Sequence, residues 1–158
     1  MNTLAETFYN AITADADIME AVGGRVVSTC FEVPPGEDDN TPLPNIIITN
    51  DGFQHNSDTK DYVWEGLEDV VNATIDVAAS SPSEVEQLVR KIRRAIENYI
   101  VAQNAQGIQT PYLQPGYPQA QPLAWDWLKP CYYQAIVYQC TQQADTDEEA
   151  DQPAEVLD

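Results

Sequence analysis

The stretch VVNATIDVAASSPSEVEQLVRKIRRAI, residues 70–96, decides the fold. From residue 71 to residue 77 apolar and polar side chains alternate, which is typical of a strand with one buried face. Ser81 then offers a capping hydroxyl, Pro82 occupies the first helical position, and Glu84 follows three residues after the cap. The stretch therefore predicts a half-buried strand over 67–79 that leads directly into a long helix.

The helix that we expect from Ser81 to about Gln103 is amphipathic. Its apolar positions recur at the spacing of one helical face and form a stripe of seven residues, namely Val85, Leu88, Val89, Ile92, Ala95, Ile96 and Tyr99. The positions between them hold four of the seven basic residues of the chain: Arg90, Lys91, Arg93 and Arg94. These two groups are called the apolar stripe and the basic strip below.

Two interpretations of the basic strip are open. It can be the solvated face of the helix, since Glu86 and Glu97 lie four residues from Arg90 and Arg93. It can also meet the acidic surface of a neighbouring copy. Nucleic-acid binding is disfavoured because the chain has 26 acidic residues and a net charge of −19, and because no aromatic or glycine residues are interleaved with the strip.

Other segments complete an α+β pattern. We expect helices over 3–14 and 15–22, strands over 25–33, 45–50 and 131–141, and loops over 34–44 and 51–66. The expected fold class is α+β, with an antiparallel sheet of about four strands and two main helices packed on one face. Residues 1–142 are expected to form one domain. Residues 143–158 carry seven acidic residues and no Lys or Arg, which predicts a disordered acidic tail.

Residues 108–130 predict an extended arm rich in proline and aromatic residues. Five of the eleven prolines lie between positions 110 and 130, and such a density disfavours both a helix and a central strand. Trp125, Trp127 and Tyr117 lie in this arm. The tryptophans either pack on the sheet of their own chain or anchor a partner, because aromatic residues are enriched at the centres of interfaces.

No pattern in the sequence predicts catalysis, a cofactor or a metal. The single histidine, His55, has no second histidine or nearby cysteine with which to hold zinc, and no nucleophile motif accompanies it. Cys30, Cys131 and Cys140 form no CxxC pair and suggest free thiols in a reducing compartment. The apolar runs are too short to span a bilayer. We therefore expect a structural or interaction protein and no enzyme.

Three segments in order resemble the tail terminator, or tail-completion, proteins of long-tailed bacteriophages. These are AITADADIMEAVGGRVVST (11–29), LPNIIIT (43–49) and ATIDVAASSPSEVEQLVRKIRRAI (73–96), so the resemblance covers roughly residues 8–100. It rests on a helix that leads through Gly-Gly-Arg-Val into a first strand, a strand that begins with proline, and a strand that enters a capped helix.

The resemblance implies a subunit of a hexameric ring in the tail or neck of a virion, assembled in the host cytoplasm. Such a ring caps the tail tube, stops its polymerisation and docks to the head-to-tail connector, while DNA only passes through its lumen. The subunit-contact candidates are Arg90, Arg93, Arg94, Trp125, Trp127 and Tyr117. An alternative of a different class is an acidic binding or inhibitor module that acts on a nucleic-acid-binding protein, although the basic strip makes a poor mimic of DNA.

Overall fold

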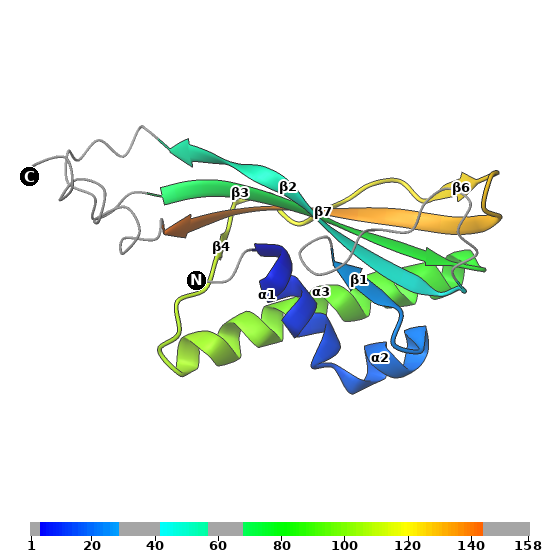
Figure 1. Cartoon of the computed structure of the whole chain (residues 1–158), viewed down its shortest axis with the longest axis horizontal. Helices are drawn as coiled ribbons and strands as arrows, with labels where there is room; N and C mark the ends of the chain where they lie inside the picture. Colours follow the sequence, from blue (N-terminus) through cyan, green and yellow to red (C-terminus); the bar gives the residue numbers. More distant parts are fainter. Residues whose placement is uncertain (1–3, 29–41, 57–67, 144–158) are drawn as a thin grey trace, which may run out of the picture.

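The computed structural model describes residues 4–28, 42–56 and 68–143, which form two layers (Figure 1). One layer is a sheet and the other consists of helices that cover a single face of it. Within these ranges the elements are α1 Leu4–Thr13, α2 Ala16–Val22, β1 Val26–Ser28, β2 Asn45–Asn56, β3 Glu68–Ala79, α3 Pro82–Ala105, β4 Tyr112–Leu113, β5 Gln119–Ala120, β6 Ala124–Asp126 and β7 Cys131–Gln143.

The sheet is mixed, which corrects the expectation of an antiparallel sheet of about four strands. In the described residues it has seven strands in the order β1-β2-β3-β7, with β4, β5 and β6 paired in turn along the outer edge of β7. β1 runs parallel to β2, whereas every other pair is antiparallel. Val26, the first residue of β1, pairs with Ile46 near the start of β2, so both strands begin at the same end of the sheet.

The predicted strand-to-helix unit is confirmed in its details. The backbone N–H of Glu84 donates to the Ser81 hydroxyl at 3.3 Å, and Pro82 begins α3. Five residues of the apolar stripe are buried, and Val89 and Tyr99 pack against them. The stripe contacts the alternate residues of β3 and β7 that face the helices. These facing residues are Ala73, Ile75, Val77, Ala79, Ile136, Tyr138 and Cys140.

One expected boundary was wrong. A strand was expected over 45–50 with a loop over 51–66, yet β2 continues to Asn56, because Gly52 adopts φ +97° at a bulge in the pairing with β3. The arm was expected to contain no helix and no central strand. In the structure it contains β4, β5 and β6, which are short edge strands that lie between its prolines. Proline is tolerated there because an edge strand need not donate every N–H to the ladder.

Several predictions fall on residues that the structure does not describe. They are the end of the first predicted strand (29–33), most of the predicted loop over 34–44, residues 57–66 of the predicted connection, Cys30, and residues 144–158 of the predicted acidic tail. The single domain over 1–142 stays a prediction.

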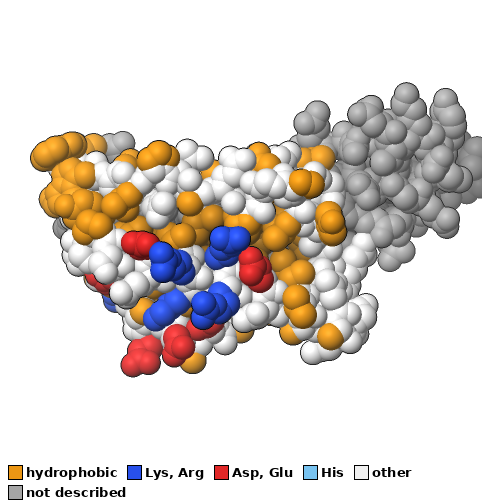
Figure 2. All heavy atoms as spheres, turned by 180° about the vertical axis from the view of Figure 1, so that it is seen from behind, with side chains coloured by type: hydrophobic (Ala, Val, Ile, Leu, Met, Phe, Trp, Pro, Cys, Tyr) orange, Lys and Arg blue, Asp and Glu red, His pale blue; other side chains and the backbone are white. Residues whose placement is uncertain are grey.

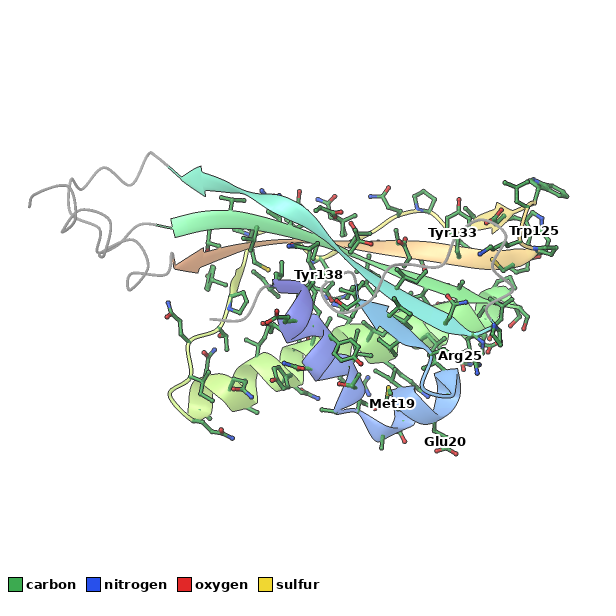
Figure 3. The ribbon with its side chains drawn as sticks, in the orientation of Figure 1. Met19, Glu20, Arg25, Trp125, Tyr133 and Tyr138 are labelled. Carbon is green, nitrogen blue, oxygen red and sulfur yellow. The ribbon has the colours of Figure 1, made fainter. Side chains whose placement is uncertain are left out.

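The Gly-Gly-Arg segment joins the helical layer to the sheet. Gly23 ends α2 at φ +60°, and its N–H donates to the carbonyl oxygen of Glu20. The guanidinium of Arg25 then donates to the carbonyl oxygens of Leu43 and Pro44, at 3.1 and 2.9 Å. Arg25 thereby fixes where β2 begins beside β1 (Figure 3).

Gly23→Ala is expected to lower the free energy of unfolding by at least about 1–2 kcal/mol, since a residue with a Cβ pays that amount in the left-handed region. A Cβ at this position would also lie 2.6 Å from Nη1 of Arg25 and displace the guanidinium. Urea denaturation of the wild type and the variant measures the difference.

Gly24→Ala is the matched control, because Gly24 has φ +76° but a Cβ added to it would have no other atom within 4 Å. This second variant should lose only the backbone contribution. Equal losses in the two variants would show that the contact with Arg25 has no energetic weight.

Tyr138→Phe is expected to leave the free energy of unfolding unchanged or to raise it by about 1 kcal/mol. The Tyr138 hydroxyl is buried and has no hydrogen-bond partner among the described residues, and burial raises its pKa. The ring itself contacts Phe8 with centroids 4.5 Å apart, and phenylalanine retains that contact. Thermal denaturation measures the change in stability, and Tyr138→Leu, which loses the ring contact, is the comparison variant. A marked loss of stability in Tyr138→Phe would instead reveal a partner for the hydroxyl.

Candidate assembly surfaces

The basic strip lies on the solvent-facing side of α3. Arg90, Lys91, Arg93 and Arg94 are all exposed, because the apolar stripe occupies the intervening positions of the helix. Figure 2 shows the blue side chains gathered in the middle of one face of the molecule. The helix phase that buries the stripe therefore also sets the direction in which the four cations point.

Acidic neighbours neutralise half of the strip. Arg90 forms an ion pair with Glu86 at 2.7 Å and Arg93 forms one with Glu97 at 3.3 Å, both between residues four apart. Such exposed pairs contribute at most about 1 kcal/mol each. Lys91 and Arg94 have no ion pair with any residue in the described ranges. As far as the described residues go, the strip thus retains two cations without an acidic partner.

The second surface is the sheet face that points away from the helices, called the open face below. Register places Ile47, Asp76 and Ala135 in one row across β2, β3 and β7, and Thr49, Thr74 and Val137 in the next row. No helix among the described residues covers this face (Figure 1). These side chains are only partly exposed, since each is flanked by its neighbours in the sheet.

Two carboxylates give the open face its charge. The Thr74 hydroxyl donates a hydrogen bond to the Asp51 carboxylate, and Asp76 lies two residues further along β3. Burial, with a smaller contribution from the charge of Asp51, raises the pKa of Asp76 above its ordinary value. β2, β3 and β7 contain no Lys or Arg. The open face is therefore apolar in part and negatively charged.

The third surface is the aromatic end, made of Trp125 in β6 together with Trp127 and Leu128 in the turn between β6 and β7 (Figure 3). The Trp125 ring lies 4.7 Å from Tyr132 and 6.0 Å from Trp127. Trp127 is 85% exposed and Leu128 is 80% exposed. The backbone N–H groups of Leu128 and Lys129 donate to the Asp126 carboxylate, which holds this turn in one shape.

The two tryptophans differ in exposure. Trp125 packs on Tyr132 of its own sheet, whereas Trp127 packs edge-on against Trp125 and is largely exposed. That the tryptophans anchor a partner stays a prediction. Tyr117 lies elsewhere, half-buried between β4 and β5, with its N–H donating to Gln114. The candidate contact residues therefore form no single site. The strip and a hydrophobic cluster at the end of the molecule are nevertheless visible on the same face (Figure 2).

The sequence indicates that the last strand has two apolar faces. Residues 131–141 are apolar at both odd and even positions, which predicts a strand that is covered on both faces or lies in an interface. The carboxylates of the open face, Asp51 and Asp76, were not predicted. In the structure the even positions from Tyr132 to Cys140 face the helices, whereas Tyr133, Ala135 and Val137 lie on the open face. Tyr133 and Tyr138 consequently point to opposite sides of the sheet (Figure 3).

The described residues offer little for chemistry. They contain no group of three or more His, Cys, Asp or Glu that could hold a metal ion. Cys131 and Cys140 are free and buried, and burial raises the pKa of the Cys140 thiol to about 12. This thiol is therefore protonated at neutral pH and a poor nucleophile. None of the helices in the described part of the chain is long and apolar enough to cross a membrane.

Comparison with known proteins finds likeness in structure. No protein-family model matches the chain, and no curated protein matches its sequence. A chain in the virion of a native gene transfer agent particle is similar in structure, with a TM-score of 0.51 and 17% sequence identity. The match covers 89% of this chain and 95% of that chain. At this identity the likeness concerns the fold.

Asp76→Asn is expected to raise the free energy of unfolding at pH 7. Since the pKa of Asp76 is raised in the folded state above the ordinary value of 3.8, the folded state binds this proton more tightly than the unfolded state does. Stability is therefore lost as the pH rises from below 3.8 through the folded pKa. The increase in the free energy of unfolding of Asp76→Asn over the wild type should reach its full size above the folded pKa and should vanish below pH 3.8.

Urea denaturation at several pH values measures this dependence, on a sample kept dilute enough to be monomeric. Asp17→Asn on α2 is the control, because Asp17 is exposed and far from the open face. An Asp76→Asn variant that is less stable than the wild type at pH 7 would contradict the assignment of burial as the dominant effect.

Proposed function

We propose that this chain is a structural protein of a phage-like virion. The observation that carries the proposal is the fold shared with a chain of the gene transfer agent virion along nearly the whole length of both chains. The surfaces fit this class of function. A half-apolar open face, a basic strip and an exposed aromatic end are features of a subunit that other subunits cover.

We propose more specifically that it is a tail terminator. In this role six copies form a ring that caps the tail tube, stops its polymerisation and docks to the head-to-tail connector. The Gly-Gly-Arg link, the proline-led β2 and the capped α3 support this role, because they carry the resemblance to that family. The chain would act through its surfaces, without a catalytic site.

The charge of the chain agrees with a ring through which DNA passes. A net charge of −19 disfavours retention of phosphate groups on its surface. The four cations of the strip sit together on α3, and two of them are already paired with glutamates. We propose that the strip serves contacts between subunits and that DNA only crosses the lumen.

Deletion of the gene from the particle that encodes it is expected to yield tail tubes of irregular, excessive length that are not joined to heads. A tube that lacks its terminator has no signal that ends polymerisation. Electron microscopy of the lysate measures tube length and the fraction of joined particles. Complementation with the wild-type chain should restore both.

Localisation provides an independent check, because a tagged chain should appear as a ring between tail and head. Normal, joined tails in the deletion strain would contradict the terminator role. Co-purification of the chain with a nucleic-acid-binding enzyme, together with normal particles, would favour the acidic inhibitor instead.

A further inference from the structure

The basic strip on α3 and the open face of the sheet carry unlike charges. Six of the seven basic residues lie in the described ranges, and four of these form the strip on α3. The central strands β2, β3 and β7 contain no basic residue, while Asp51 and Asp76 are the acidic residues with described side chains on their open face. One copy therefore presents a local group of cations on α3 and two carboxylates on the open face.

Like surfaces cannot pair favourably. Two strips brought together would oppose Lys91 and Arg94 of one copy to the same cations of the other, and two open faces would oppose pairs of carboxylates. Charges of one sign that face each other across an interface are repulsive. The arrangement that brings unlike charges together is the strip of one copy on the open face of the next.

We propose that the basic strip on α3 of one copy docks on the open face of β2, β3 and β7 of a second copy. This inference rests on the proposed ring and names the two surfaces that build it. Lys91 and Arg94, which lack ion pairs within the described part of the chain, meet Asp51 and Asp76 of the next copy. Around these charges, Ile47, Ala135 and Val137 supply apolar area to be buried.

The contact is head-to-tail, since each copy uses two different surfaces. A contact of this kind closes into a ring when the rotation between copies divides a full turn, and otherwise it grows into a filament. The aromatic end takes no part in it. Trp127 and Leu128 therefore stay exposed for a virion protein of another kind.

Complementary charge reversal tests the proposal. The first variant carries Lys91→Glu and Arg94→Glu, and the second carries Asp51→Lys and Asp76→Lys. Each variant alone should associate about a hundredfold more weakly than the wild type, because its contact now opposes like charges. An equimolar mixture should assemble again, with the two variants alternating, and native mass spectrometry resolves their ratio.

A matched control carries Asp17→Lys and Glu20→Lys on α2, where both side chains are exposed. It changes the net charge as much as the second variant does and should associate like the wild type. Because lysine in the sheet can disturb folding, Asp51→Asn with Asp76→Asn provides a milder variant. It should stay folded by circular dichroism and still associate about tenfold more weakly.

Cysteine trapping applies the test inside the particle. A chain with both Arg94→Cys and Asp76→Cys should form a ladder of covalent oligomers on oxidation, whereas chains with either substitution alone should not. Dimers from the Arg94→Cys chain alone would indicate strip-on-strip pairing and overturn the proposal. Wild-type association in both charge-reversed variants, or a monomeric wild type without a ladder in the particle, would overturn it as well.

The two proposals fail in different ways. If the chain forms a ladder of cross-linked oligomers but is absent from the tail, the head-to-tail contact is supported and the terminator role is refuted. If the chain lies at the end of the tail but forms no ladder, the terminator role is supported and this interface is refuted.

Discussion

The packing of the apolar stripe of α3 against β3 and β7 is the contact on which the rest of the structure depends. Ile92 and Ile96 are completely buried, and truncating such a side chain typically costs about 2–5 kcal/mol. The exposed ion pairs of the same helix contribute at most about 1 kcal/mol each. Burial therefore fixes the rotation of α3, and the direction of the basic strip follows from that rotation.

The same contact determines what the sheet leaves uncovered. α1 and α3 occupy one face, and β7 contributes Ile136 and Tyr138 to that side. Its intervening residues, including Tyr133 and Val137, then lie on the opposite face with no cover in the described ranges. A strand that is apolar on both sides, in a sheet covered on one side, is expected to complete its burial against another chain.

Features that depend on residues close in sequence, such as helix caps and the apolar face of a helix, could be predicted from the sequence. The cap at Ser81, the apolar stripe and the end of α2 at Gly23 depend on neighbours in sequence, and the structure has them as predicted. The continuation of β2 past Asp51-Gly52, where a loop was expected, depends instead on pairing with β3. The edge strands around Gln119 and Ala124 likewise exist because β7 offers an unpaired edge, and no periodicity in the arm encodes that edge.

The unlike outer surfaces of the two layers constrain how copies of the chain can associate. A symmetric dimer would need a surface that complements itself, yet the strip is basic and the open face carries only acidic charges among its described side chains. Charge thus favours the strip of one copy facing the open face of the next, and the apolar area around Ile47 and Val137 provides the surface to be buried. Because each copy then contacts its two neighbours through two different surfaces, the number of copies in a closed ring depends on the rotation between neighbouring copies.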